Sequence, residues 1–359
     1  MKNLKDTLSI AWIIGTKDIL DALKNKSMRV NILIMMGMVV FFYWFGSLRP
    51  FDKNVNVVVY DEGNTNLTLE PVTLADGAKY SFQEAASLPG MEQKMANRNL
   101  GLVLPANLDQ TLASGGTPIL SGYIFWADRM KVAELEAKYS QAFTEILGQP
   151  VQVSIGQNIV IPQAGAAGNH STISYLLIYF IFWTALSIIP HLILEEKQTK
   201  TLDALLTSPA SPGEIVLGKA LAGFFYILII GGLAVALFWL YIAQWSLAFV
   251  AFLGYALLAT GLALAVGSFV KSPLQVGLWT VVLILLLEIP AIFFMEPNLK
   301  AGIRMVMTWF PSSALASLFR YACSTGVTPT QLWSNLAIVV VSIVAIFGLV
   351  VWKVRRSDR

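Results

Sequence analysis

Charged residues are scarce in this sequence. Of its 359 residues, 13% are Asp, Glu, Lys or Arg, whereas 56% are hydrophobic. A soluble globular domain carries about 25% charged residues, so this composition excludes an ordinary soluble protein. The deficit is concentrated in apolar stretches of about twenty residues, which is the length that crosses the hydrocarbon core of a bilayer. The sequence therefore predicts an integral membrane protein.

Cysteine and histidine are almost absent. Cys323 is the single cysteine, so no intrachain disulfide can form, and we interpret it as a small buried apolar side chain. The two histidines, His170 and His191, do not make a metal-binding cluster. A net charge of +3 is too small to indicate nucleic-acid binding. We expect no metal, no cofactor and no catalytic residue in this chain.

A nucleotide-binding motif is also missing. The phosphate-binding pattern G-x-x-x-x-G-K-[ST] does not occur, and the nearest text, Gly218-Lys219-Ala220, lacks both the first glycine and the hydroxyl. No predicted strand precedes it, as a phosphate-binding loop requires. We therefore expect that this chain does not hydrolyse ATP by itself.

Six apolar stretches predict membrane-spanning helices. The first begins after about 29 residues rich in Lys and Asp and has no small-residue cleavage site, so we interpret it as a retained helix. An even number of spans places both termini on one side of the membrane. The predicted spans are 30–48, 173–194, 215–243, 247–270, 274–295 and 336–352.

The segment before the first span predicts an amphipathic helix. Its apolar residues recur at a spacing of three and four, and its charged residues fall on the opposite face. A helix that lies at the membrane surface fits this pattern, and a cytoplasmic extension of the first span fits it equally well. The apolar face is Leu8, Trp12, Gly15, Ile19 and Leu23, and the charged face is Lys17, Asp21 and Lys24.

Basic residues predict the orientation in the membrane. Six Lys and Arg residues precede the first span and four follow the last, whereas the loop between the third and fourth spans has no charge. Short basic flanks stay in the cytoplasm. We therefore expect a multi-pass protein of the cell membrane with both termini inside and the long segment 49–171 outside.

Segment 49–171 predicts an inserted α+β domain. Residues 55–60, 100–105 and 119–126 are typical of short strands, and residues 83–97 and 129–147 are typical of helices. Residues 150–170 predict a loose connector back to the membrane. The expected fold is thus a bundle of six transmembrane helices with an inserted α+β extracytoplasmic domain.

The predicted organisation divides the rest of the chain into four parts. Residues 1–29 form the cytoplasmic interfacial helix, 30–48 the first span, 172–352 a five-helix membrane part and 353–359 a cytoplasmic tail. Within the membrane part, residues 297–333 are too polar to span and predict short helices in the outer interface, with Pro311 between two of them.

The loop between the second and third spans contains the most specific pattern. Three leucines make a one-turn apolar stripe that Pro209 ends, which predicts a short amphipathic helix at about 196–210. Ser211-Pro212-Gly213-Glu214 then has the residues of a capping box, which predicts that the third span starts there. A short helix exposed in this way could dock into a partner protein and transmit its movements. The leucines are Leu202, Leu205 and Leu206.

This loop resembles the signature loop of type-2 ABC transporter permeases. It departs from the family pattern at Lys200, where glycine is usual, and at Asp203, where glutamate is commoner. Further similarity lies in VVVYDEGN and NLGLVLPANLDQTLASG of the inserted domain and in FPSSALASLFRYA before the last span. The matching loop residues are Glu195, Glu196, Thr201, Leu202, Leu205, Leu206, Pro209, Ser211, Glu214, Ile215, Gly218 and Lys219.

The resemblance implies a function and a set of partners. It implies the permease subunit of an ATP-driven exporter, which forms its translocation path as a homodimer or with a sister permease. It implies a separate ABC ATPase subunit that binds ATP and contacts the loop at 195–219. The exported substrate is not readable from the sequence. The alternative is a membrane-anchored structural or interaction component of a cell-envelope or secretion complex.

Two ionisable residues in the apolar spans have alternative interpretations. Glu288 is the one acidic residue well inside a span, and such a carboxylate marks a transport pathway or a proton relay. It could instead lie near the outer interface and pair with Arg304 or Arg320. His191 follows Pro190 and could be a pH-sensitive gate, or an anchor at the headgroups.

Overall fold

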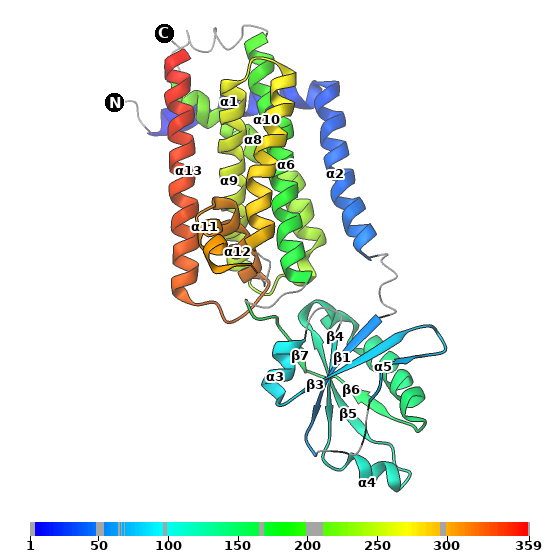
Figure 1. Cartoon of the computed structure of the whole chain (residues 1–359). Helices are drawn as coiled ribbons and strands as arrows, with labels where there is room; N and C mark the ends of the chain where they lie inside the picture. The colour runs from blue at the N-terminus through cyan, green and yellow to red at the C-terminus, as the bar shows by residue number, and fades with distance from the viewer. Residues whose placement is uncertain are drawn as a thin grey trace.

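The computed structural model shows a helical bundle at one end and a sheet domain at the other (Figure 1). The residues that it describes are 4–47, 54–63, 65, 67, 69–95, 99–164, 169–198, 211–294 and 299–357. Both chain termini lie at the end of the bundle away from the sheet domain, and we call this the terminal end. The sheet domain comprises the described residues from 54 to 164.

Nine helices of the described chain belong to the bundle. Five of them, α6, α8, α9, α10 and α13, are long and apolar enough to cross a membrane, and α1 and α2 pass the same test only as a pair bent by 85°. The sequence predicts six spans, and the described structure has five helices that could span a membrane, or six if the bent pair is counted as one span. The bounds are α1 Leu4–Lys24, α2 Lys26–Ser47, α6 Asn169–Gln198, α8 Pro212–Leu237, α9 Trp245–Phe269, α10 Pro273–Phe294, α11 Ala301–Met307, α12 Pro311–Ala322 and α13 Pro329–Ser357.

Helix α6 is the centre of the bundle. It packs against α2, α8, α9, α10 and α12, and 72% of its most apolar stretch is buried. Hydrogen bonds also join α6 to two of these helices. The side chain of Asn31 in α2 donates to the carbonyl of Ser187, and the hydroxyl of Thr280 in α10 donates to the carbonyl of Leu186. By contrast, only 11% of the corresponding stretch of α13 is buried, so this helix presents an apolar face to lipid or to a partner chain.

Helix α12 differs from the sequence-based expectation. Pro311 starts it, as predicted, but the helix is buried inside the bundle and not exposed on its outer surface. Its residues from Ser312 to Phe319 are buried against α6, α9, α10 and α13. The alternation of small and large residues in SSALASLF lets the helix insert between its neighbours, which the local pattern does not reveal. Helix α11, in contrast, is exposed on most of its surface.

The sheet domain is built on one seven-stranded sheet. The strand order is β2-β3-β1-β4-β5-β6, and β7 also pairs with β5. Strand β1 lies between β3 and β4 and is parallel to both, whereas β4 and β5 are antiparallel. The bounds are β1 Asn54–Asp61, β2 Val72–Thr73, β3 Lys79–Ala85, β4 Asn99–Leu104, β5 Ile119–Phe125, β6 Gln152–Ser154 and β7 Ile159–Val160.

Helices cover both faces of this sheet, which explains the continuous apolar run of β1. Val57 faces the core under α5 (Val132–Leu147), where Phe143 is fully buried. Val58 points to the other face, where Met91 of α3 (Leu88–Lys94) covers it. A central strand that is buried on both faces needs apolar residues at successive positions, so its sequence is a continuous hydrophobic segment. The short helices α4 (Leu108–Ala113) and η2 (Trp126–Lys131) complete the domain.

Two predictions for the inserted domain were wrong in part. The helix predicted at 83–97 is strand β3 up to Ala85, and of its described residues only Leu88–Lys94 are helical. Ser87 caps that helix and Pro89 lies in its first turn, so the proline starts the helix rather than interrupting it. The connector predicted at 150–170 contains the edge strands β6 and β7. Strands of two or three residues are too short to give a periodic signal.

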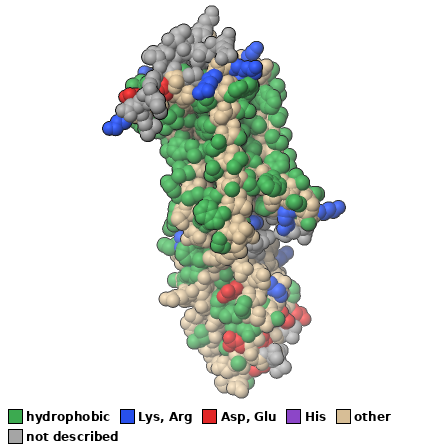
Figure 2. Space-filling view, turned by 90° about the vertical axis from the view of Figure 1, so that its left-hand side faces the viewer, with side chains coloured by type: hydrophobic (Ala, Val, Ile, Leu, Met, Phe, Trp, Pro, Cys, Tyr) green, Lys and Arg blue, Asp and Glu red, His purple; other side chains and the backbone are tan. Residues whose placement is uncertain are grey.

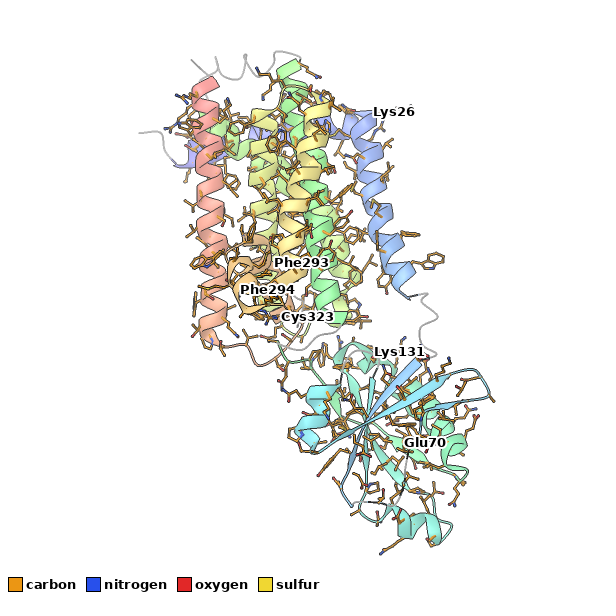
Figure 3. All side chains as sticks on the ribbon, viewed as in Figure 1. Lys26, Glu70, Lys131, Phe293, Phe294 and Cys323 are labelled. Atoms are coloured by element: carbon orange, nitrogen blue, oxygen red, sulfur yellow. The ribbon has the colours of Figure 1, made fainter. Side chains whose placement is uncertain are left out.

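The sheet domain contacts the bundle through an arginine between two tryptophans. Arg129 lies 4.1 Å from the ring centre of Trp126 and 5.3 Å from that of Trp239, in the short helix η3 (Trp239–Tyr241) after α8. The guanidinium also donates to the carbonyl of Leu240 at 2.6 Å. Figure 3 shows Lys131 of the same segment at the edge of the domain that faces Cys323 of the bundle.

Candidate functional site

The loop singled out by the sequence joins α6 to α8 at the terminal end of the bundle. Thr201, Leu202, Leu205, Leu206 and Pro209 lie outside the described residues, as does the side chain of Glu196. The short helix predicted at 196–210 therefore stays a prediction beyond Gln198, where α6 ends. The structure describes the two helix ends on either side of the loop, namely the end of α6 near Glu195 and the start of α8 near Glu214.

The end of α6 is tied to two neighbouring helices. The exposed carboxylate of Glu195 accepts hydrogen bonds from Asn25 Nδ2, at 3.2 and 3.3 Å, at the bend between α1 and α2. Two residues on, Lys197 Nζ donates to the carbonyls of Gly267, Ser268 and Val270 at 2.7, 2.8 and 3.1 Å.

The contact of Lys197 with α9 has a simple electrostatic basis. The last carbonyls of a helix have no partner within it and carry partial negative charge, so an ammonium group stabilises them. Burial, together with the positive charges of Lys353 and Lys271, lowers the pKa of Lys197 to about 8. Lys197 therefore holds α9 to the end of α6, and it was missed because the carbonyls that it binds lie about 70 residues away.

The start of α8 has the predicted capping box. Ser211 Oγ accepts from the backbone N–H of Glu214 at 3.3 Å, and the Ser211 N–H donates to Glu214 Oε2 at 2.6 Å. Pro212 occupies the first turn. The Glu214 side chain is buried and fixed, and a cap of this type contributes about 1 kcal/mol. The loop therefore leads into a rigid helix start.

Helix α1 packs directly on the first turns of α8. Gly15 and Gly218 permit this approach, because a Cβ on Gly218 would lie 2.7 Å from Ile14 Cβ and 2.9 Å from the Ala11 carbonyl oxygen. Next to this contact, Lys219 Nζ lies 3.3 Å from Asp18 Oδ2, and both side chains are 6% exposed. A buried ion pair thus joins α1 to the helix that begins at the loop.

The apolar face of α1 predicted from the sequence is buried only in part, at Gly15, which packs on α8. Leu8, Trp12 and Leu23 are exposed, at 51%, 64% and 42%, and are free to contact lipid. The buried residues of α1 are instead Ala11, Ile14, Gly15, Asp18 and Ala22, of which three are small. These recur at a spacing of three and four, so a search for small-residue periodicity would have found them.

Glu288 lies inside the bundle and not at its surface. Its side chain is 4% exposed, and neither carboxylate oxygen has a hydrogen-bond partner in the described part of the chain. The predicted pairing with Arg304 or Arg320 is therefore not found among these residues. Helix α10 continues through Pro290. The tyrosines within electrostatic range of the carboxylate are Tyr175, Tyr179 and Tyr255.

Other buried polar groups in the bundle share this lack of partners. Each belongs to α6, α9, α10 or α12, and no such group occurs among the described residues of the sheet domain. Buried polar atoms without partners are costly, and most native structures keep few of them. They are Trp183 Nε1, Thr184 Oγ1, Tyr255 Oη, Thr260 Oγ1, Ser312 Oγ, Ser313 Oγ and Arg320 Nε. His191 is half-buried in α6.

The bundle and its inserted sheet domain define a multi-pass membrane protein, because five to six helices are long and apolar enough to span a bilayer. The family described as ABC-2 family transporter protein matches residues 26–352, which include the sheet domain, α6, α8, α9 and α10, and α13 as far as Trp352. The chain belongs to this family. It is accordingly a membrane component of a transporter and not itself a catalytic subunit. A comparison with curated proteins finds no match.

Proposed function

We propose that the chain is the permease subunit of an ATP-driven exporter and that a separate ABC ATPase drives it through residues 195–219. The observation that carries this proposal is the anchoring of both ends of the loop. Glu195 and Lys197 fix the end of α6 to the α1–α2 bend and to α9. Asp18 and Lys219 fix the start of α8 to α1.

These anchors make the loop a lever on the whole bundle. A displacement of the loop by a partner moves the ends of α6 and α8 together, and the ion pair and carbonyl contacts pass the displacement to α1 and α9. Packed helices respond to such a push as rigid bodies, because close-packed interfaces shift between discrete arrangements rather than deform. ATP-driven closure of the partner would therefore tilt helices across the membrane.

The proposed orientation places the terminal end of the bundle in the cytoplasm. In Figure 2, Lys and Arg side chains occur at this end of the bundle and also at its other end, beside the sheet domain, whereas apolar side chains cover most of the bundle between them. Basic flanks of membrane helices stay in the cytoplasm. The exposed apolar faces of α10 and α13 are where a second protomer would pack to complete a dimer.

The polar interior of the bundle supports a path for the substrate through α6, α9, α10 and α12. Glu288 and the unpartnered hydroxyls make no hydrogen bonds within the described residues. They would gain them from water or substrate once the helices separate, which lowers the free energy of an open state. Glu288 is then an acidic group on this path. A carboxylate inside a membrane-spanning helix is costly, so such residues usually mark a path for substrate or protons.

The test is a co-purification and ATPase assay with the ABC ATPase encoded nearest to the gene. Leu205→Glu or Leu202→Glu places a charge on the predicted docking helix, and we expect it to abolish binding and stimulation of ATP hydrolysis. Leu23→Glu is the matched control, because Leu23 is 42% exposed at the end of α1, at the same end of the bundle. Intact coupling in both loop variants would contradict the proposal and favour an envelope-anchoring role.

A further inference from the structure

A polar cleft lies between the sheet domain and the bundle. Its volume is about 530 Å³, which is within the range of roughly 300–1,000 Å³ that small-molecule sites occupy. Its walls come from α3, β5, β7 and the chain that follows β7, and from the loop between α12 and α13. Most of the lining is polar, unlike the interior of the bundle. The polar side chains are Glu92, Tyr123, Gln157, Asn158, Gln163 and Thr325.

Two backbone hydrogen bonds hold the sheet domain against the bundle at this cleft. The N–H of Ala164 donates to the carbonyl of Thr325, and the N–H of Thr325 donates to the carbonyl of Pro162, each at 2.9 Å. Gln163 and Thr325 thereby form a parallel β-bridge. The two sides of the cleft are therefore joined at one point, and their spacing there is fixed.

The polar side chains of the cleft are available to a ligand. None of the six makes a hydrogen bond or an ion pair with another described residue. Lys94 follows Glu92 by two residues on α3, but its ammonium donates to the carbonyl of Glu84 at 2.8 Å. Polar groups without a protein partner bind water, and a ligand with matching polar groups can take the place of that water.

The charge in the cleft has one sign. Glu92 is the one charged residue of its described lining. Burial raises the pKa of Tyr123, and so do the negative charges of Glu92 and Glu62. A phenol whose ionisation is opposed by these carboxylates lies within their negative potential. The cleft therefore favours a positively charged ligand and disfavours an anion.

We propose that this cleft binds a small organic cation with several ammonium groups, one of which lies beside the Glu92 carboxylate and the Tyr123 ring. The carboxylate supplies the opposite charge, and an aromatic ring attracts an ammonium group through its electron-rich face. Amide side chains then offer their oxygens to the other N–H groups of the ligand. These amides are Gln157, Asn158 and Gln163.

Two other classes of ligand fit the cleft less well. A metal ion needs several ligands, and the described residues contain no group of three His, Cys, Asp or Glu side chains that could hold one. A lipid chain needs apolar surface to cover, whereas most of this lining is polar. An organic cation matches both the charge and the hydrogen-bonding groups.

A bound cation would act at the junction between the two parts of the chain. It would contact β5 and β7 on one side and Thr325, in the loop after α12, on the other. It would therefore strengthen the attachment of the sheet domain, beside the connector that leads to α6. Binding depends neither on the proposed exporter function nor on the proposed orientation.

The experiment uses the purified full chain in a neutral detergent at low salt, with spermidine as the probe. Isothermal titration measures the affinity, and hydrogen exchange read by mass spectrometry locates the site. Sucrose, which is neutral, and glutarate, which is an anion, are titrated in the same way. We expect spermidine alone to bind and to slow exchange at 157–163 and around Thr325. Added salt should weaken this binding, because it screens exposed charges.

Four variants identify the residues that bind the cation. Glu92→Gln should lower the affinity for spermidine about fivefold, the upper end for an ion pair at an exposed position. Tyr123→Leu removes the ring and should lower it about two- to fivefold, whereas Tyr123→Phe keeps the ring and should bind as the wild type does. Glu70→Gln is the matched control, because Glu70 is exposed next to β2, at the opposite edge of the sheet from β7.

Four outcomes would overturn the proposal. They are equal binding of sucrose, wild-type affinity in Glu92→Gln, an equal loss of affinity in Glu70→Gln, and no slowing of exchange at 157–163. The assay contains no ATPase, so its failure would leave the proposed exporter function in place. Loss of ATPase coupling through the loop would equally leave the cation site in place.

Discussion

The buried ion pair between Asp18 and Lys219 leads to the sharpest energetic prediction. Its charged atoms are 3.3 Å apart, and both side chains are 6% exposed. At this distance two unit charges attract by about 5 kcal/mol if the effective dielectric constant is about 20. Much of that attraction offsets the cost of removing both charges from water.

Removal of one partner should therefore cost more than removal of both. Asp18→Asn or Lys219→Met alone leaves a buried charge without its partner and should destabilise the chain by about 3–5 kcal/mol. The double variant has neither charge to bury, so we expect it to recover most of that loss. Since Lys219 follows the close contact at Gly218, the single variants should also loosen α1 from α8.

The assay is a double-mutant cycle on the chain in detergent, read by thermal unfolding. Each single variant should lower the midpoint by roughly 6–20 °C, if the factor of about 2–4 °C per kcal/mol for proteins of about 150–250 residues is applied to this longer chain. Asp21→Asn on the exposed face of α1 is the matched control and should leave the midpoint unchanged. Single variants as stable as this control, or a double variant no better than the singles, would refute the reasoning.

Three further predictions concern the helix cap, the domain junction and the bundle interior. Ser211→Ala removes one bond of the capping box and should destabilise the start of α8 by about 1 kcal/mol, visible as faster hydrogen exchange there; unchanged exchange would contradict it. Arg129→Ala should free the sheet domain from η3 and speed proteolysis between the two parts, whereas Arg129→Lys should retain only part of the contact because lysine cannot stack as a planar group. Glu288→Gln should lower the rate of transport while the chain still assembles with its partner; unchanged transport would remove Glu288 from the proposed path.

Features that depend on local pattern could be predicted from the sequence. The spans follow from runs of about twenty apolar residues, and the capping box follows from Ser211 and Glu214 three residues apart. The strand at Asn54–Asp61 follows from β-branched residues next to a turn signal. In each case the residues that decide the structure are neighbours in the chain.

Features that depend on distant partners could not be predicted in this way. Lys197 appeared as an unremarkable loop residue, because its acceptors are at the end of α9. Asp18 was hidden by the more obvious apolar face of α1, which turned out to be mostly exposed. Helix α12 looked interfacial, and only its packing partners show that it is buried. For the same reason strand β3 was taken for part of a helix, since pairing with β1 decides its conformation.

The most direct test of the coupling role is site-specific cross-linking from the loop. Cys323 is the single cysteine of the chain and is 1% exposed, so Leu205→Cys introduces one accessible thiol. Ile119→Cys, at an exposed position of the sheet domain, serves as the comparison. We predict that position 205 cross-links to the ABC ATPase in membranes and that position 119 does not. Cross-linking from position 119 and none from position 205 would contradict both the proposed orientation and the coupling of this permease to its ATPase.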